Sequence, residues 1–333
     1  MNRPLRHIAV VRFSAMGDVA ILFPVLSAVL KQNDLEVTLF TRPQFVPIFS
    51  SLKGLNIHAV DLKNKHAGPL GLWRLAREIK AINPDYFLDL HDVLRTKLIR
   101  TFLGMLGVSV RTFDKGRAQK NQRVKHFDPS APWLLSTHER YAAGFRTVGL
   151  KVNLDPGLRP PIKSQKGALI GFAPFAAYPG KTYPLDLAKE LCKGLSQKGY
   201  NVLLFGAPGS EAEQLAQVAQ DIKNTKATAG QGTFAQELEL ISSLDLMIAM
   251  DSANGHLAAN FGVPVITLWG ATHPSLGFMP YGQSPERQLY ADRGQYPELP
   301  TSVYGNKLPQ DYTELMRSIP VSDILSKVTQ ILA

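Results

Sequence analysis

The sequence predicts an α/β fold in which two open parallel sheets follow one another along the chain, each flanked by helices. With 333 residues the chain is longer than one hydrophobic core usually serves, and short β-branched runs alternate with helical patterns in both halves. Residues 151–167 are rich in Pro and Gly and poor in apolar anchors, which indicates a domain boundary. We therefore predict domains at residues 1–158 and 167–333, with a ligand-binding cleft between them.

The elements of the first half follow from its apolar pattern. Apolar runs predict strands at residues 7–13, 36–40, 56–60, 85–90 and 108–113. Helical spacing predicts helices at 19–31, at 70–82 before Asn83-Pro84, and from the fourth strand to about residue 106. Residues 114–130 are polar and lack this periodicity, so they predict a loop, and a helical pattern returns at 133–150.

The second half repeats the scheme. Strands are predicted at residues 168–173, 201–205, 246–250 and 263–268. Helices are predicted at 185–198, 211–222, 234–243 and 255–261, and a final amphipathic helix at 321–332. Residues 271–319 are rich in loops.

The composition favours an anionic partner. The net charge is +10 and the pI is about 9.6, which suits nucleic acid, an anionic membrane surface or phosphorylated substrates. Nine basic and only two acidic residues lie between 91 and 126, although an ordinary solvated surface would explain this stretch equally well.

Cysteine usage and the apolar pattern indicate the compartment. The single cysteine, Cys192, lies in a predicted helix and can form neither an internal disulfide nor a thiolate metal site. We expect a cytoplasmic protein, because no leader pattern and no membrane-spanning run is apparent. The eight histidines lack the His-x-x-x-His spacing, so we expect no tightly bound metal.

Two familiar motifs are excluded by their context. Gly180-Lys181-Thr182 resembles the end of a P-loop, but Phe175 stands where that motif needs its first glycine. Residues 230–235 match the letters of a dinucleotide fingerprint, but they lie deep in the second half, where a plain turn is the better interpretation.

The turn at residues 251–256 is the strongest candidate for a phosphate site. It joins a predicted strand to a predicted helix, and helix N-termini bind anions through free backbone N–H groups. Ser252 adds a hydroxyl and His256 adds a ring N–H. Asp251 beside a phosphate is electrostatically unfavourable, so we expect it to orient donors or to bind a sugar hydroxyl.

Three other segments follow predicted strands. Gly17 permits a close turn after the first strand, and Asp18 then sits where a helix dipole favours a carboxylate, although it also suits a simple cap. Lys181 can pair with a phosphate or be an ordinary exposed lysine. Glu211 can bind ribose hydroxyls or merely favour the start of a helix.

These segments together resemble glycosyltransferase family 9, whose best-known members are ADP-heptose:lipopolysaccharide heptosyltransferases. The resemblance covers essentially the whole chain, and its most specific part lies in the second half. It rests on these motifs: residues 14–18 (Ser-Ala-Met-Gly-Asp) with Phe23-Pro24, Leu88-Asp89-Leu90-x(4)-Arg95, Asp251-Ser252-x(3)-His256-Leu257-Ala258-Ala259, Gly262-Val263-Pro264-Val265 and Trp269-Gly270-x-Thr272.

The resemblance implies a GT-B fold, with two Rossmann-like domains and a C-terminal helix, the acceptor on the N-terminal domain and the nucleotide sugar on the C-terminal one. It implies inverting, metal-independent transfer, with no cofactor besides the donor, most simply ADP-heptose. Asp18 matches the general base, Lys181 the lysine that binds the donor phosphates and Glu211 the ribose-binding acid. The remaining donor-binding positions are Gly17, Asp251, Ser252, Ala253 and His256.

The implied acceptor is an anionic lipopolysaccharide core or a related cell-surface glycan. Basic residues are the candidates to hold it, and the same charge suits peripheral contact with the inner membrane. These residues are Lys63, Lys65, Arg95, Lys120 and Arg123.

The chain departs from the family pattern at three places. Ala253 stands where the family usually has glycine, Ala271 where it has proline, and Phe175-Ala176-Ala177 lacks hydroxyl groups. A different nucleotide sugar is therefore the first alternative. Two other classes fit less well: a nucleic-acid-binding protein would interleave aromatic with basic residues, and a nicotinamide-dependent oxidoreductase would carry its glycine fingerprint at the first turn. We therefore expect no nucleic-acid partner.

Overall fold

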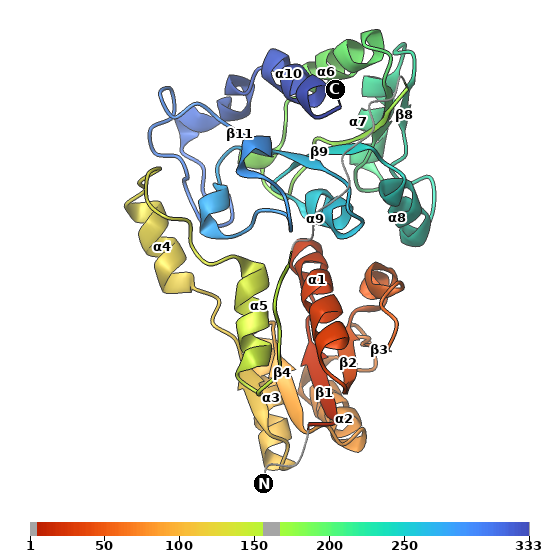
Figure 1. Cartoon of the computed structure of the whole chain (residues 1–333), viewed down its shortest axis with the longest axis vertical. Coiled ribbons are helices and arrows are strands. Elements are labelled where there is room, and N and C mark those ends of the chain that lie inside the picture. Colours follow the sequence, from red (N-terminus) through yellow and green to blue (C-terminus); the bar gives the residue numbers. More distant parts are fainter. Residues whose placement is uncertain (1–4, 156–166, 333) are drawn as a thin grey trace. The chain divides into compact units, whose positions relative to one another are not determined.

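The computed structural model describes residues 5–155 and 167–332 (Figure 1). These residues group into two compact units. The first takes its residues from Met1–Lys115 and Thr137–Asp155, and the second from Gly116–Ser136 and Pro156–Ala333. Residues 116–136 therefore group with the second half of the chain, although they precede the predicted boundary. The predicted linker at residues 159–166 lies outside the described residues.

The first unit contains a five-stranded parallel sheet in the order β3-β2-β1-β4-β5. Its strands are β1 (His7–Val11), β2 (Glu36–Thr41), β3 (Leu55–Ala59), β4 (Tyr86–Asp89) and β5 (Val110–Thr112). Its helices are α1 (Met16–Gln32), α2 (Gly68–Ala81), α3 (Leu94–Met105) and α5 (Thr137–Arg146).

Helices cover both faces of this sheet. Ala9 and Val11 of β1 share a buried cluster with Leu75 of α2 and Ile99 of α3. Ile8, which alternates with them, is buried outside that cluster, because neighbouring residues of a strand point to opposite faces. Helix α1 packs beside α5, and α2 beside α3 (Figure 1). The first pair therefore covers one face and the second pair the other.

The second unit contains a six-stranded parallel sheet in the order β11-β10-β9-β6-β7-β8. Its strands are β6 (Leu169–Ala173), β7 (Asn201–Leu204), β8 (Thr225–Ala227), β9 (Leu246–Met250), β10 (Val265–Trp269) and β11 (Gln288–Tyr290). Its helices are α4 (Arg117–Lys125), α6 (Leu185–Gln197), α7 (Ser210–Ala219), α8 (Phe234–Ser242), α9 (Ala253–Asn260) and α10 (Val321–Leu332).

The main core of this unit lies under α6, α7 and α10. Phe172 of β6 packs in one cluster with Leu191, Leu215 and Ile324 of these three helices. Cys192 belongs to the same cluster, and burial raises the pKa of its thiol to about 12, so it serves as apolar filling rather than as a nucleophile. Helices α8 and α9 pack against each other outside this cluster.

The two parallel α/β sheets confirm the predicted fold class, and most predicted elements recur. The strand at residues 246–250 coincides with β9, and the final helix with α10. The predicted loop at 114–130 is wrong, because it contains α4. The buried position of this helix is filled by a polar residue, Lys120, whose Nζ lies 3.8 Å from the ring centroid of Phe278. The helix therefore has no apolar periodicity by which the sequence could reveal it.

Two short strands, β8 and β11, were not predicted. Each has three residues and lies at an edge of the second sheet, where a strand needs no buried apolar run. Within the described part of the chain, none of the helices combines the length and apolar character needed to cross a membrane.

Candidate active site

After the two central strands of the first sheet, β1 and β4, the chain continues toward opposite edges of the sheet. β1 is followed by β2 on one side, and β4 by β5 on the other. Such a switch point leaves a crevice beyond the carboxyl ends of the two strands, where open α/β sheets bind ligands. The turn after β1 leads to Gly17 and Asp18 in the first turn of α1, and the loop after β4 carries His91.

Asp18 is held by a buried arginine. Its Oδ2 atom lies 2.5 Å from Nη2 of Arg12 and accepts the backbone N–H of Ala15 at 3.4 Å. Nη1 of Arg12 donates to the carbonyl of Leu90 at 2.6 Å, so the arginine ties the loops after β1 and β4 together. The Asp18 side chain is still 32% exposed. The carboxylate is therefore fixed in orientation yet accessible to a substrate.

Gly17 has no unusual backbone conformation. It lies in the first turn of α1, and it is not among the described glycines with positive φ. A tight turn therefore does not explain the glycine here.

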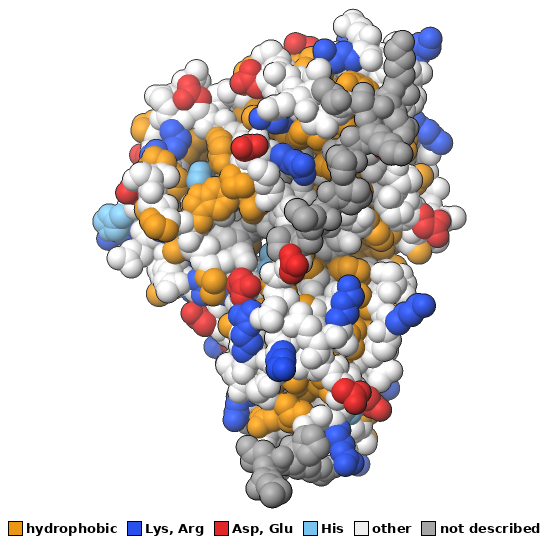
Figure 2. Space-filling model, viewed as in Figure 1, with side chains coloured by type: hydrophobic (Ala, Val, Ile, Leu, Met, Phe, Trp, Pro, Cys, Tyr) orange, Lys and Arg blue, Asp and Glu red, His pale blue; other side chains and the backbone are white. Residues whose placement is uncertain are grey.

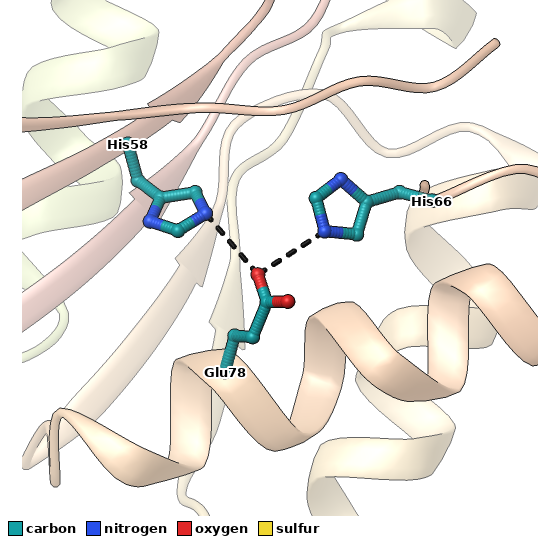
Figure 3. Close-up of side chains that lie close together, drawn as sticks. All are labelled: His58, His66 and Glu78. Atoms are coloured by element: carbon teal, nitrogen blue, oxygen red, sulfur yellow. Dashed lines mark hydrogen bonds and ion pairs between the residues drawn. The ribbon is translucent and has the colours of Figure 1, made fainter. Parts of the chain in front are cut away.

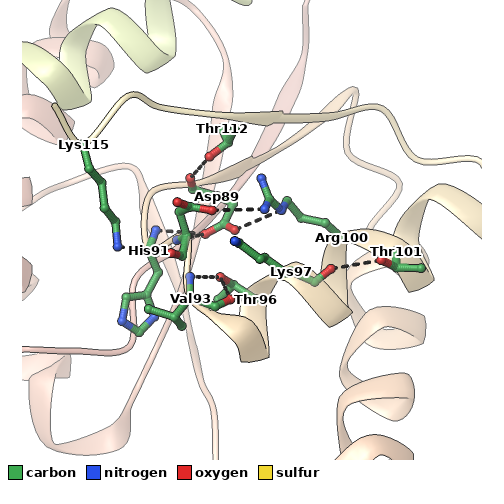
Figure 4. Close-up of polar contacts among 10 residues, drawn as sticks. Asp89, His91, Val93, Thr96, Lys97, Arg100, Thr101, Thr112 and Lys115 are labelled. Carbon is green, nitrogen blue, oxygen red and sulfur yellow. Dashed lines mark hydrogen bonds and ion pairs between the residues drawn. The ribbon is translucent and has the colours of Figure 1, made fainter. Parts of the chain in front are cut away.

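The loop after β4 is built around the fully buried Asp89. Its Oδ1 atom accepts the backbone N–H groups of His91 and of the following residue at 2.9 and 2.8 Å, and Oδ2 lies 3.3 Å from Nε of Arg100 (Figure 4). This turn places Nε2 of His91 3.3 Å from Oγ of Ser14. Burial, helped by the Arg12 charge, lowers the pKa of His91 to about 3, so the imidazole is neutral at physiological pH.

We expect Arg12→Gln to lower kcat by about 10–100-fold, because a carboxylate displaced by a fraction of an ångström no longer meets its substrate correctly. The donor KM should stay close to the wild-type value, since Arg12 belongs to the first unit. Arg12→Lys keeps the charge and should restore part of kcat. Steady-state kinetics at saturating donor would check this, and an unchanged kcat in Arg12→Gln would contradict it.

The second sheet has its own switch point, between β6 and β9. β7 and β8 extend the sheet beyond β6, while β10 and β11 extend it beyond β9. Lys181 follows β6 and Asp251 follows β9, and Nζ of Lys181 lies 3.1 Å from Oδ2 of Asp251. Thr272, after β10, donates its hydroxyl to the same oxygen at 2.7 Å. The side chains of the ion pair are 10% and 11% exposed. A nearly buried pair therefore spans the switch point.

The stem of Lys181 is closely packed. A Cβ atom on Gly305, whose φ is +77°, would lie 2.8 Å from Cδ of Lys181, so a larger residue there would displace the lysine stem. The ring of Tyr178 lies 5.9 Å from Nζ. The ammonium group is thus held at one point and not free to sample the solvent.

Helix α9 begins just after Asp251, the acidic member of the ion pair with Lys181. Ser252 is its N-cap residue, yet its Oγ is buried without a hydrogen-bond partner in the described chain. Ala253 is the first helical residue, and His256, in the first turn, is 5% exposed. The first N–H groups of a helix have no acceptor within it and carry the positive end of its dipole. An anion at this point would meet several unsatisfied donors.

The departure from the family pattern at Ala271 has a structural reason. Its backbone N–H donates to the carbonyl of Gly180 at 2.8 Å, a bond that proline would lack. A Cβ atom on Gly270 would lie 2.2 Å from the same carbonyl oxygen. The end of β10 is therefore tied closely to the loop that carries Lys181.

Glu211 stands in the first turn of α7. Its Oε2 atom accepts the backbone N–H of Ala207 at 2.7 Å, which closes the loop after β7. A Cβ atom on Gly206 would lie 3.1 Å from this oxygen. Glu211 therefore has a structural contact in the loop before α7.

The five basic candidates for acceptor binding fall into both units. In the first unit, Lys63 and Arg95 are exposed, while Nζ of Lys65 lies 2.8 Å from Oε1 of Glu78. In the second unit, Lys120 is buried, and Nη2 of Arg123 donates to the carbonyl of Pro132 at 2.8 Å. The structure therefore does not bring these residues together on one surface of one unit.

A pocket of about 480 Å³ lies within the second unit, next to Thr272. The ring of His273 stacks on Tyr290 with centroids 5.1 Å apart, and the guanidinium carbon of Arg293 lies 4.7 Å from the ring centroid of Phe127. Burial, then the charges of Arg293 and Arg123, lower the pKa of His273 to about 4. Neutral rings with a cation over one of them suit a ligand that has both apolar faces and anionic groups.

Sequence reasoning missed several of these residues. Arg12 and Thr272 lie inside or beside the quoted motifs, and their position after strands was a signal that could have found them. His273 and the residues around it lie in long loops without periodicity, so the sequence contains no comparable signal for the pocket.

Comparison with known proteins identifies the family. The model of "Glycosyltransferase family 9 (heptosyltransferase)" matches residues 72–302, which is more than half of the chain. The chain belongs to glycosyltransferase family 9. Within this family it is similar to a lipopolysaccharide heptosyltransferase 3 of Escherichia coli, 33% identical over 359 aligned positions, which cover 95% of this chain and 96% of the relative. A second such enzyme, from strain K12, is 26% identical, with 95% of each chain covered.

Solved structures of other glycosyltransferases share the fold. A family 9 glycosyltransferase of Veillonella parvula superposes with a TM-score of 0.75 at 18% identity, covering 100% of this chain and 98% of the other. Escherichia coli heptosyltransferase WaaC with ADP superposes with a TM-score of 0.69 at 14% identity, covering 98% and 100%. An iron-containing dodecameric glycosyltransferase, TibC of enterotoxigenic E. coli, gives 0.57 at 10% identity, covering 99% and 76%. The GT-B fold predicted from the resemblance is thereby confirmed, and the chain is a glycosyltransferase.

Proposed function

We propose that this family 9 glycosyltransferase moves heptose from ADP-heptose onto a lipopolysaccharide core or a related cell-surface glycan. The observation that carries the proposal is the Lys181–Asp251 pair at the second switch point, directly before the N-terminus of α9. The names of the relatives supply the donor and the acceptor, since several are lipopolysaccharide heptosyltransferases and WaaC was solved with ADP.

The donor diphosphate is proposed to bind at the start of α9. Its negative charge would pair with Lys181 and accept hydrogen bonds from the first N–H groups of the helix and from the Ser252 hydroxyl. Asp251 would hold the lysine in place through its ion pair and through Thr272. Glu211 is proposed to reach the ribose hydroxyls with its second carboxylate oxygen.

Asp18 is proposed as the general base in an inverting reaction. It would take a proton from the acceptor hydroxyl while that oxygen attacks the anomeric carbon and the nucleoside diphosphate leaves on the opposite side. Arg12 would orient the Asp18 carboxylate. The exposed part of the Asp18 side chain would give the acceptor access to it. Gly17 and Ala253, which lie at the starts of α1 and α9, are proposed to allow close approach of the donor.

Transfer is proposed to need no metal. The charge that develops on the departing diphosphate would be stabilised by Lys181, by the α9 dipole and by His256. Full activity after dialysis against a chelator is the expected result, and loss of activity that returns with one divalent metal would contradict it.

The acceptor is proposed to be held by basic residues, and peripheral contact with an anionic membrane surface would follow from the same charge. On the face shown in Figure 2, Lys and Arg side chains are interspersed with Asp and Glu. A continuous basic band suited to nucleic acid is therefore not apparent on that face.

We expect the double variant Lys63→Glu/Arg95→Glu to raise the acceptor KM by about tenfold or more, because it reverses two exposed charges near the carboxyl edge of the first sheet. The donor KM should not change. Lys80→Glu, at the far end of α2, reverses an exposed charge away from that edge and is the matched control. If the control and the double variant behave alike, this acceptor assignment fails.

The donor is tested by a thermal-shift and calorimetric screen of ADP-, GDP-, UDP- and CMP-sugars, followed by transfer assays with the sugar that binds. ADP-heptose should bind most tightly and should stabilise the protein in proportion to its concentration. Preference for another nucleotide would favour the alternative donor suggested by Ala253 and by the hydroxyl-poor residues 175–177. Binding of none of the four would overturn the proposal.

A further inference from the structure

His58, His66 and Glu78 form a compact cluster in the first unit, away from Asp18 and the switch point (Figure 3). Nε2 of His58 lies 3.2 Å from Oε2 of Glu78, and Nε2 of His66 lies 3.1 Å from the same oxygen. Both rings and the carboxylate point toward one another from β3, from the loop after it and from α2. We propose that this cluster is a binding site for a zinc-like divalent transition metal.

The spacing of the three atoms fits such an ion. Zinc binds imidazole nitrogen and carboxylate oxygen at about 2.0–2.2 Å in tetrahedral geometry, which places neighbouring ligand atoms about 3.3 Å apart. The two observed separations are 3.2 and 3.1 Å, and all three atoms lie within 4.8 Å of one another. An ion can therefore be inserted among them with little rearrangement of the backbone.

The buried histidine gives the second argument. His66 is 2% exposed, and its Nδ1 atom is buried with no hydrogen-bond partner among the described residues. Its Nε2 atom is the one that faces the Glu78 carboxylate, so this nitrogen would bind the ion, while Nδ1 would carry the ring proton.

The loop that presents His66 is already rigid. Oδ1 of Asp61 accepts the backbone N–H groups of Lys63 and Asn64, each at 3.0 Å, and the carbonyl of Asp61 accepts the N–H of His66 at 2.8 Å. A Cβ atom on Gly71 would lie 2.3 Å from the carbonyl carbon of His66, so α2 presses directly on this backbone. The ligand is held in position without a metal.

The surroundings allow an ion to enter. The side chains of His58 and Glu78 are 37% and 24% exposed, so the fourth coordination position faces solvent and can take a water. Lys65 occupies the other carboxylate oxygen at 2.8 Å, but its side chain is 53% exposed and can turn toward solvent. Its positive charge would lower the affinity below that of a closed structural site.

The site is proposed to stabilise the fold, not to act in transfer. β3 is the edge strand of the first sheet, and β2 separates it from β1, which precedes Asp18. Neighbouring strands lie about 4.8 Å apart, so the two strands are roughly 10 Å from each other. This inference does not depend on the proposed donor or acceptor.

The test is metal binding by the full chain without a histidine tag. After chelator treatment, the wild type should bind one equivalent of Zn²⁺ by calorimetry, and Co²⁺ should give the strong visible absorption of a tetrahedral site. Because the only cysteine is buried in the other unit, thiolate cannot contribute to that spectrum. Zn²⁺ should also raise the melting temperature.

Two variants identify the ligands. His58→Gln and Glu78→Gln alter partly exposed side chains and should weaken Zn²⁺ binding by more than about tenfold. His126→Ala removes an exposed histidine of the second unit and should change nothing. Absence of Zn²⁺ binding by the wild type, or unchanged affinity in Glu78→Gln, would overturn the proposal. Neither result would bear on the transferase reaction, which is measured separately.

Discussion

Asp18→Asn is expected to lower kcat by about 10²–10⁴-fold, the usual contribution of a general base. Asparagine has nearly the same shape as aspartate but cannot accept the proton of the acceptor hydroxyl. Binding of the nucleotide sugar should remain close to wild type, because the proposed donor groups other than Gly17 belong to the second unit and the variant leaves Gly17 unchanged. Single-turnover transfer assays and donor calorimetry on the same preparation would measure the two effects separately.

The controls for this prediction follow from the Arg12 contact. Removing the charge of Asp18 leaves Arg12, which is 4% exposed, without its counter-ion, so the melting temperature must be measured alongside activity. Asp18→Glu keeps the charge and should retain more activity than Asp18→Asn. Near-normal turnover by a folded Asp18→Asn variant would remove this residue as the base.

Lys181→Ala should have the second largest effect. We expect kcat/KM for the donor to fall by about 10²–10³-fold, with a higher KM and a lower kcat, because the lysine would neutralise the diphosphate in both the bound and the departing state. Alanine also leaves Asp251, 11% exposed, as an uncompensated charge beside the donor phosphates, which adds repulsion. Steady-state kinetics over a range of donor concentrations would measure both constants.

Two further variants separate charge from packing. Lys181→Arg keeps the charge and should recover part of the loss in kcat. Lys198→Ala removes an exposed lysine at the end of α6 and should behave as the wild type. Normal kinetics in Lys181→Ala would show that the assignment of Lys181 is wrong.

The two candidate sites have the same topological origin. In each unit the polar groups follow the central strands of the sheet, β1 and β4 in the first unit and β6 and β9 in the second. In each unit a buried contact also joins the two segments: Arg12 to Leu90, and Lys181 to Asp251. The switch point thus explains why residues far apart in the sequence meet.

The elements that were predicted correctly have an apolar pattern that covers their whole length in the sequence. β9 is buried at all five of its residues, and α10 has an apolar stripe at helical spacing, so the sequence pattern alone defines both. α4 failed because its buried residue is Lys120, whose stem packs while its ammonium group lies against the ring of Phe278. A search for apolar periodicity does not recognise such a residue as buried.

The same distinction holds for the candidate sites. Asp18, Lys181 and the turn that begins at Asp251 were candidates from the sequence, because each follows an apolar strand, and Asp18 and the turn also lie within the quoted motifs. The contacts of Thr272 and of the cluster around Glu78 were not predicted, because they join distant positions: Thr272 lies 21 positions after Asp251, and Glu78 lies 12 positions after His66.

The sequence by itself thus determined the order of most strands and helices, the two parallel sheets and the family, because these follow from periodicity and from short motifs. Only the tertiary structure decided which charges are paired, that residues 116–136 group with the second unit, and that two histidines converge on one carboxylate. The physical reason is that pairing and burial depend on contacts between segments, whose free energy no local pattern contains.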